Sequence, residues 1–178
     1  TIALSSLGYT KPGLEFVGGE VRLEGEDVIT GGADNDSLYG GQDNDDLYGG
    51  DGDDIVEGGD GDDTLDGSGE TLSRSYDGGA GDDFILAAKV TDAAEGGDGD
   101  DTIRPAAGDD LSYGGAGDDV IADGFGRDIL YGGEGADSLS GGANGDFLQG
   151  GAGADTLIGD GGSDYLAGGS GNDVIDGR

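Results

Sequence analysis

A nine-residue period organises most of this chain and limits what it can fold into. From Gly31 the frame runs as GGADNDSLY, GGQDNDDLY, GGDGDDIVE and GGDGDDTLD, and further copies continue to Asp176. RLEGEDVIT at 22–30 fits as a weak first copy. A short fixed period indicates a repeat architecture, in which each unit buries its apolar face only by stacking on its neighbours.

Two positions of this frame carry opposite chemistry. The sixth residue is Asp in every copy except the one at 67–75, and the eighth is Ile, Leu or Val except at Arg74, Ala94 and Ser112. The copy at 67–75 is poor, and we assign a two-residue insertion after it, Tyr76 and Asp77. Because random acidic sequence would not hold both requirements in phase, the pattern argues against a chain that is disordered under all conditions.

Composition excludes several classes of function. The 178 residues carry a formal net charge of −34, with seven scattered basic residues and no Cys or His. Disulfides, thiol nucleophiles, zinc-thiolate sites and imidazole bases are therefore absent, and a nucleic-acid footprint is not expected. No apolar run reaches the roughly 18 residues of a membrane span. Aspartate pairs such as Asp62 and Asp63 recur in seven copies, so we interpret them as metal or solvent ligands and expect no enzymatic activity.

The repeat resembles the nonapeptide G-G-x-G-x-D-x-U-x of the repeats-in-toxin (RTX) family. The resemblance covers about residues 22–177 and implies an all-β fold, a right-handed parallel β-roll or β-solenoid that binds several Ca²⁺ ions. In such a roll the first six residues of each nonad form a metal-binding turn and the last three a short strand, with two nonads per turn of the coil. We therefore expect a roll over 22–178 and a cap or linker segment over 1–21.

The residue types agree with this chemistry. Glycines at the first, second and fourth positions permit φ > 0, and Asp34 and Asp43 replace the fourth glycine because Asp enters the left-handed region more readily than most residues. Carboxylates and backbone carbonyls are hard oxygen ligands, and many of them on flexible turns suit Ca²⁺ better than Mg²⁺. The aspartates could instead merely solvate turns. The thin apolar core cannot offset the entropy of ordering, so we expect Ca²⁺ binding to supply the folding free energy.

Because two nonads make a turn, alternate copies stack on the same edge. The copies that begin at 40, 58, 78, 96, 114, 132, 150 and 168, here named the regular flank, all begin Gly-Gly. Their expected metal ligands are the sixth-position carboxylates Asp45, Asp63, Asp83, Asp101, Asp119, Asp137, Asp155 and Asp173. The glycines expected around the ions are Gly40, Gly58, Gly61, Gly78, Gly81, Gly96, Gly99, Gly114, Gly117, Gly132, Gly135, Gly150, Gly153, Gly168 and Gly171.

The copies that begin at 31, 49, 67, 87, 105, 123, 141 and 159, here named the degenerate flank, lose the consensus after the second. We expect intact metal sites at Asp36 and Asp54, and weak or absent ones at three later positions, Asp92, Asp110 and Asp128. Three basic residues in these copies could stand in for missing metal: Arg74, Lys89 and Arg127. The alternative is sequence drift with unchanged binding.

The seventh and ninth positions point away from the core. On the degenerate flank they would merge into an apolar and aromatic stripe, which either marks a partner surface or reflects ordinary strand preference. The residues of this possible partner surface are Leu111, Tyr113, Ile129, Tyr131, Phe147 and Tyr165.

The resemblance implies a secreted or cell-surface bacterial protein that leaves the cell unfolded by type I secretion and folds outside, where calcium is plentiful. RTX proteins include toxins, proteases, lipases, adhesins and surface-layer proteins, and we favour a scaffold or adhesive module here. The alternative is a carbohydrate-binding accessory module of a secreted polysaccharide-active enzyme, with the tyrosines stacking on sugars. The chain begins at Thr1 and contains no Met, so we expect a processed product or a piece of a longer protein, and open coil ends could self-associate.

Overall fold

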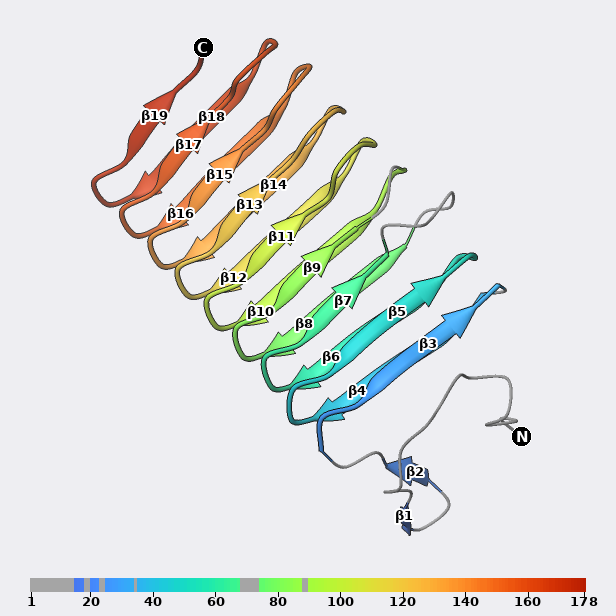
Figure 1. Cartoon of the computed structure of the whole chain (residues 1–178). Helices are drawn as coiled ribbons and strands as arrows, with labels where there is room; N and C mark the ends of the chain where they lie inside the picture. The colour runs from blue at the N-terminus through green and yellow to red at the C-terminus, as the bar shows by residue number, and fades with distance from the viewer. Residues whose placement is uncertain (1–14, 18–19, 23–24, 34, 68–73, 88–89) are drawn as a thin grey trace.

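Two parallel β-sheets, joined by turns along both edges, form a long coil that runs from the strand beginning at Val28 to the strand ending at Asp176 (Figure 1). The computed structural model describes residues 15–17, 20–22, 25–33, 35–67, 74–87 and 90–178, and every regular element in these ranges is a strand. The all-β parallel β-roll expected from the sequence is confirmed. No described helix is long and apolar enough to cross a membrane.

Each coil turn contributes one strand to each sheet. The eight-stranded sheet contains β4 (Ser37–Gln42), β6 (Ile55–Asp60), β8 (Ser75–Ala80), β10 (Ala93–Asp98), β12 (Leu111–Ala116), β14 (Ile129–Glu134), β16 (Phe147–Ala152) and β18 (Tyr165–Ser170). The nine-stranded sheet contains β3 (Val28–Gly32), β5 (Asp46–Gly50), β7 (Thr64–Asp66), β9 (Phe84–Leu86), β11 (Thr102–Arg104), β13 (Val120–Ala122), β15 (Ser138–Ser140), β17 (Thr156–Ile158) and β19 (Val174–Asp176).

Strand register follows the double repeat. Each strand pairs in parallel with the strand two places further along the chain, so Ile103 lies beside Ile121, eighteen residues away. The regular-flank turns therefore stack along one edge of the coil and the degenerate-flank turns along the other (Figure 1). The predicted two nonads per coil turn are confirmed.

The core is a single file of eighth-position side chains from each sheet. Ile103, Ile121 and Leu139 from one sheet and Leu130 and Leu148 from the other are almost completely buried. These aliphatic side chains alternate with exposed neighbours, as a strand with one buried face requires. Because each coil turn adds only two such side chains, the core is thin along its whole length.

The two-residue insertion lies earlier than the sequence frame placed it. Tyr76 pairs with Val56 and Ala94, which are eighth-position residues, and Tyr76 is itself 1% exposed. Arg74 therefore occupies a sixth position, and its N–H donates to Asp92 Oδ1 as a sixth-position N–H does elsewhere. The assignment of Arg74 to the eighth position and of Tyr76 and Asp77 to an insertion was wrong. The extra residues lie before Arg74.

The turn glycines serve two different purposes. Second- and fourth-position glycines such as Gly97 and Gly99 have φ of 120° and 135°, as expected. Asp43 holds φ 73° at a fourth position, which confirms that Asp can replace glycine there, whereas Asp34 lies outside the described residues. First-position glycines do not have positive φ, so that part of the prediction was wrong; they are required for space.

At the N-terminal end, β1 (Glu15–Val17) and β2 (Glu20–Arg22) form an antiparallel pair, separate from the two sheets of the roll. Residues 1–14 lie outside the described part, so the cap or linker role of 1–21 stays a prediction. The weak first copy supplies β3, with Ile29 in the core and Asp27 buried at the sixth position.

Candidate metal centre

Sixth-position aspartates form a hydrogen-bonded column along the regular flank. In each turn the backbone N–H of this aspartate donates to Oδ1 of the equivalent residue one coil turn further on. Asp83 donates to Asp101 at 2.8 Å, and Asp101 donates to Asp119 at 2.9 Å. The column from Asp27 to Asp173 has no gap. One oxygen of each carboxylate is thus committed to stacking the turns.

The second oxygen of seven of these carboxylates is buried and has no hydrogen-bond partner. On the regular flank this holds for Oδ2 of Asp45, Asp63, Asp83, Asp101, Asp119, Asp137 and Asp155. Each of these residues is at most 2% exposed. At the end of the coil Asp173 is half-buried. Orphaned buried oxygens at every turn are costly unless something compensates them, so their regular recurrence indicates a ligand.

The unpartnered oxygens face a tight backbone cradle. A Cβ built on Gly40 would lie 2.6 Å from Asp45 Oδ2 and 2.6 Å from the carbonyl oxygen of Gly58 in the next turn. The same approach of Oδ2 to the first glycine of its copy recurs at Gly58, Gly78, Gly96, Gly114, Gly132, Gly150 and Gly168. A side chain there would fill the space between carboxylate and carbonyl. The fourth-position glycines Gly61, Gly81, Gly99, Gly117, Gly135, Gly153 and Gly171 lie against backbone of the previous turn.

Burial and repulsion between neighbouring carboxylates raise the pKa of several aspartates in the column. Burial raises the pKa of Asp83 and Asp119 to about 7 and the pKa of Asp45 and Asp101 to about 6. The hydrogen bond from the backbone N–H lowers the pKa in each case, and nearby carboxylates raise it further. The protein alone therefore disfavours a fully ionised column, as expected where cations are required to balance it.

On the degenerate flank, the Arg74 guanidinium shows where the oxygen atoms of one turn converge. Arg74 Nη2 donates to the carbonyl oxygens of Gly50 and Gly52 at 2.7 and 2.8 Å, and Nη1 lies 2.9 Å from Asp54 Oδ2. The Arg74 and Asp54 side chains are completely buried. Second- and fourth-position carbonyls and a sixth-position carboxylate therefore surround one cationic group. This geometry supports Arg74 as a stand-in cation and argues against the intact metal site predicted at Asp54.

The donor chemistry of the regular flank fits calcium. Its turns offer carboxylate and carbonyl oxygens and no nitrogen or sulfur side-chain ligand, and their sixth-position residue is always an aspartate. Such an all-oxygen set on glycine turns matches the preference of Ca²⁺. The residues present therefore fit the ion that the sequence predicted.

The degenerate flank keeps its aspartate column despite losing the glycines. Asp92, Asp110 and Asp128 are at most 4% exposed, and the ladder of N–H to Oδ1 bonds runs through them. Asp36, at the start of this flank, is half-buried. Arg127 is exposed, and within the described ranges it donates its backbone N–H to Asp109 Oδ1 and no side-chain hydrogen bond, while Lys89 lies outside those ranges. The sixth-position aspartates of this flank are thus buried even in copies that have lost the consensus glycines.

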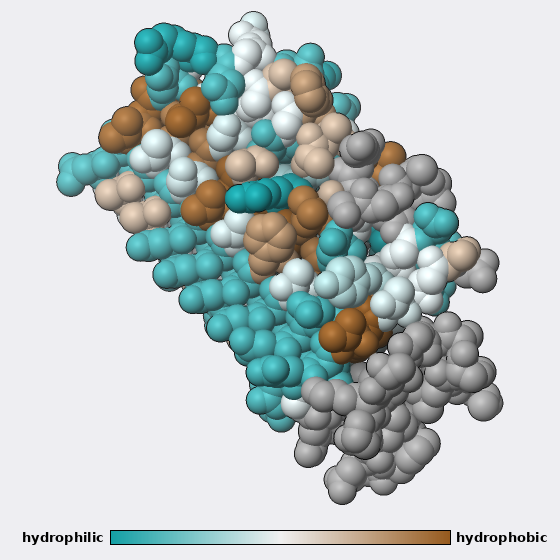
Figure 2. Space-filling view, viewed as in Figure 1, coloured by the Kyte–Doolittle hydropathy of each residue, from teal (hydrophilic) through white to brown (hydrophobic). Residues whose placement is uncertain are grey.

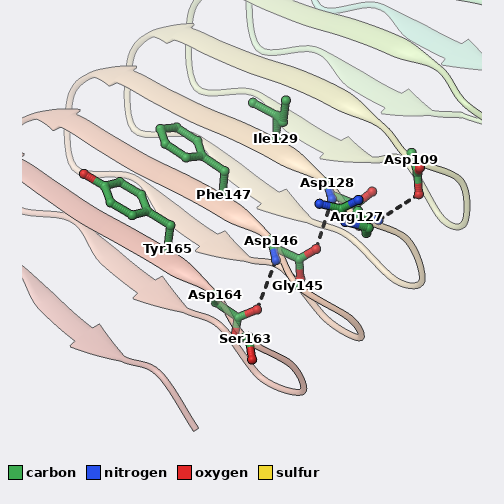
Figure 3. Close-up of a pocket in the computed structure, with 10 residues that line it drawn as sticks. All are labelled: Asp109, Arg127, Asp128, Ile129, Gly145, Asp146, Phe147, Ser163, Asp164 and Tyr165. Atoms are coloured by element: carbon green, nitrogen blue, oxygen red, sulfur yellow. Dashed lines mark hydrogen bonds between the residues drawn. The ribbon is translucent and has the colours of Figure 1, made fainter.

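The predicted apolar stripe forms a row of aromatic rings. Tyr113 and Tyr131 stack with centroids 4.7 Å apart and planes 4° apart, and Phe147 and Tyr165 stack at 5.0 Å and 3°. Tyr131 and Phe147 join the two pairs at 5.8 Å. Figure 3 shows Ile129, Phe147 and Tyr165 beside a pocket of about 430 Å³, whose other side is formed by acidic turn residues. We name Tyr113, Tyr131, Phe147 and Tyr165 the aromatic row; Leu111 is half-buried and Ile129 exposed in the same sheet.

Comparison with known families agrees with the geometry. The family model for the RTX calcium-binding nonapeptide repeat, four copies long, matches residues 23–56, 40–70, 77–112, 113–148 and 140–175. No curated protein matches the chain. RTX nonapeptide repeats bind Ca²⁺, and the matches cover nearly the whole roll. The chain belongs to the family of RTX calcium-binding nonapeptide repeat proteins.

Proposed function

We propose that this β-roll is a calcium-driven folding module, which orders outside the cell and serves as a scaffold, adhesive or surface-layer part of a secreted bacterial protein. Residues 22–178 would form the roll and residues 1–21 its cap or linker. The observation that carries the proposal is the column of buried, unpartnered Oδ2 atoms along the regular flank. An ionised column of this kind requires cations to be stable, so at neutral to alkaline pH the fold would follow the calcium concentration.

The ions would be held by the regular-flank aspartates together with the glycine turns around them, and by Asp36 on the other flank. Bound calcium would neutralise the column and tie each turn to the next. The chain itself supplies the Oδ1 ladder, which fixes each carboxylate, and the glycine cradle, which leaves room beside Oδ2. Because the apolar core adds only two side chains per coil turn, it cannot supply this cohesion alone.

The proposed location outside the cell is supported by the dependence of folding on calcium. Cytosolic calcium is scarce and extracellular calcium is plentiful, so a chain of this composition would stay unfolded during type I secretion and fold after it. RTX β-roll repeats are typically non-catalytic structural modules. Adjacent carboxylate pairs recur in seven copies between Asp45 and Asp119, which supports a structural role and no enzymatic activity for this module.

Circular dichroism during a calcium titration tests the proposal. We expect little strand signal in EDTA and a cooperative gain of strand signal as calcium approaches millimolar concentration. Magnesium at the same concentration serves as the control, because Mg²⁺ requires a tight octahedron of oxygen ligands that these turns do not readily provide. Full strand signal in EDTA would refute the proposal.

A second candidate is a carbohydrate-binding accessory module, which the exposed aromatic row and its adjoining pocket favour. Tyr165 is 60% exposed and Tyr113 is 41% exposed. One face of each ring in the row is covered by its stacking partner, however, and sugar stacking needs an open face. Tyr165 lies on β18, the last strand of its sheet, so its outer face is the one best placed for a sugar.

Glycan binding and self-association distinguish the two candidates. Glycan binding in calcium that Tyr165→Ala abolishes, with Tyr39→Ala at the other end of the sheet as a control, would favour the accessory module. Ordered arrays or oligomers in calcium, with no glycan bound, would favour the scaffold.

A further inference from the structure

A cluster of three carboxylates stands out on the degenerate flank. Asp110 and Asp128 are the sixth-position residues of successive coil turns, and Asp123 begins the copy that contains Asp128. One carboxylate oxygen from each of the three lies within 4.8 Å of the others. In every regular-flank copy the first position is glycine. Asp123 therefore brings a side-chain oxygen to a place where the regular repeat offers only backbone.

The free oxygens of the cluster lack protein partners. Asp110 is 2% exposed and Asp128 is 1% exposed, and Oδ2 of each is buried without a hydrogen-bond partner. Their Oδ1 atoms accept N–H bonds from Asp92 and Asp110, respectively. Asp123 repeats this division: Oδ1 accepts the N–H of Gly124 at 2.7 Å, and Oδ2 is buried and unpartnered. Three buried carboxylate oxygens without a hydrogen-bond partner thus remain in one small region.

Within the described part of the chain, no arginine or lysine side chain pairs with them. Arg127, adjacent to Asp128 in sequence, is exposed, and it forms no ion pair within the described ranges. This contrasts with Asp54, whose carboxylate meets the buried Arg74 guanidinium. Figure 3 shows Arg127 beside Asp128, in the same turn and lining the same pocket. The positive charge that compensates the cluster therefore does not come from an arginine that the structure describes, and a bound cation would supply it.

The backbone around the cluster explains why an additional carboxylate is useful. On this flank the turns pair directly: Phe125 bridges Ala107 and Ala143. The N–H of Phe125 bonds to Ala106 O, and the N–H of Gly108 bonds to Phe125 O. Carbonyl oxygens engaged in these bonds are poorer metal ligands, because part of their lone-pair capacity is taken. A side-chain oxygen from Asp123 offsets that loss.

We propose that Asp110, Asp123 and Asp128 form a three-carboxylate calcium site on the degenerate flank, with Asp123 as a side-chain ligand from the first position of its copy. The site replaces the weak or absent sites expected at Asp110 and Asp128, and it rests on the proposed calcium-binding function. All its side-chain ligands are carboxylate oxygens, which suits Ca²⁺. With three anionic ligands it retains its ion at lower free calcium than the rest of this flank.

Equilibrium dialysis with ⁴⁵Ca²⁺ tests the site in the full chain. Asp123→Asn keeps the shape of the side chain and removes its charge, and Glu134→Gln, an exposed residue of β14, is the control for the loss of one charge. At a free calcium concentration that just saturates the wild type, we expect Asp123→Asn to bind one ion fewer and Glu134→Gln to bind the same number. An unchanged count and affinity in Asp123→Asn overturns the proposal.

Anomalous diffraction from wild-type crystals grown in calcium provides a test that does not depend on a variant folding. The site predicts an ion within about 2.3–2.6 Å of an oxygen from each of the three aspartates. Ions along the regular flank with none touching Asp123 would overturn this site alone. An absence of ions from both flanks would overturn the proposed function as well.

Discussion

The backbone N–H of Asp101 donates to Oδ1 of Asp119 at 2.9 Å, while Oδ2 of Asp119 is buried without a partner. The two oxygens of one carboxylate thus have separate roles, one in stacking the turns and the other facing the cradle. The same division recurs along the whole regular flank (Figure 2 shows the lower-left edge of the roll, where these turns lie, as a continuous hydrophilic band).

Asp119→Asn separates these two roles. The amide oxygen can still accept the N–H of Asp101, but an NH₂ group replaces the second carboxylate oxygen, and no cation binds it. We expect the calcium concentration at the folding midpoint to rise by about tenfold or more. Asp118→Asn is the matched control, since this neighbour is exposed and its Oδ1 remains available to Ala136 N–H. Equal midpoints for the two variants, measured by circular dichroism, would contradict a ligand role for Asp119.

Ile121→Ala tests the thin core. Ile121 is completely buried between its coil neighbours, whereas Val120 beside it on β13 is 42% exposed. We expect Ile121→Ala to lower the free energy of unfolding in saturating calcium by about 2–5 kcal/mol. Val120→Ala should change it by about 0.5 kcal/mol or less. Urea denaturation in excess calcium measures both, and similar losses for the two would argue against a core made of eighth-position side chains.

Arg74→Ala removes the buried cation opposite Asp54. The Gly50 and Gly52 carbonyls and the Asp54 carboxylate would be left without their partner, and breaking a buried ion pair costs about 3–5 kcal/mol. We expect that loss in limiting calcium, measured by thermal or urea unfolding. Arg178→Ala is the control, since Arg178 pairs with Asp176 at the exposed end of the chain, and no measurable change is expected.

Arg74→Asp restores the sixth-position carboxylate in the same place. If the guanidinium occupies a metal position, the variant should bind one more calcium ion than the wild type in equilibrium dialysis. A count that stays the same while the roll still folds would show that Arg74 fills a different role.

Acidification should act in opposite directions with and without calcium. In the metal-free fold the pKa of Asp83 and Asp119 is raised to about 7, above the ordinary value of 3.8. A raised folded-state pKa means that the folded chain binds protons more tightly, so the metal-free roll gains stability as pH falls from about 7 towards 4. Calcium requires the ionised carboxylates, so its affinity should fall over the same range.

Circular dichroism at pH 8 and pH 5 measures both effects. In EDTA we expect more strand signal at pH 5 than at pH 8, and in a calcium titration a higher midpoint at pH 5. Loss of the metal-free strand signal on acidification would contradict the burial of these carboxylates.

The sequence was enough to predict the architecture because two chemically opposite positions recur in phase. The Asp at the sixth position and the aliphatic residue at the eighth specify the turn and the strand independently, and both match the structure at Asp101 and Ile103. The nine-residue frame was assigned wrongly at 67–77, where neither the sixth-position Asp nor the eighth-position aliphatic residue is present. There Arg74 and Tyr76 fit no template, and only the pairing of Tyr76 with Val56 and Ala94 places them.

Two further features could not be read from the repeat. First-position glycines could serve either a positive φ or a close approach. The φ of Gly40, which is not positive, and the 2.6 Å from a Cβ placed on it to Asp45 Oδ2 distinguish the two. Asp123 looked like a lost glycine, because its contact with Asp110 crosses from one coil turn to the next. The sequence signal that could have indicated this site was an aspartate in the first position of a copy, where the repeat normally has glycine.

The most direct test of the account is an anomalous difference map from crystals grown in millimolar calcium. The account predicts a file of ions along the regular flank, each beside the Oδ2 atoms of successive residues such as Asp83, Asp101 and Asp119. Density that shows these carboxylates turned to bulk solvent, with no ion between neighbouring turns, would contradict it.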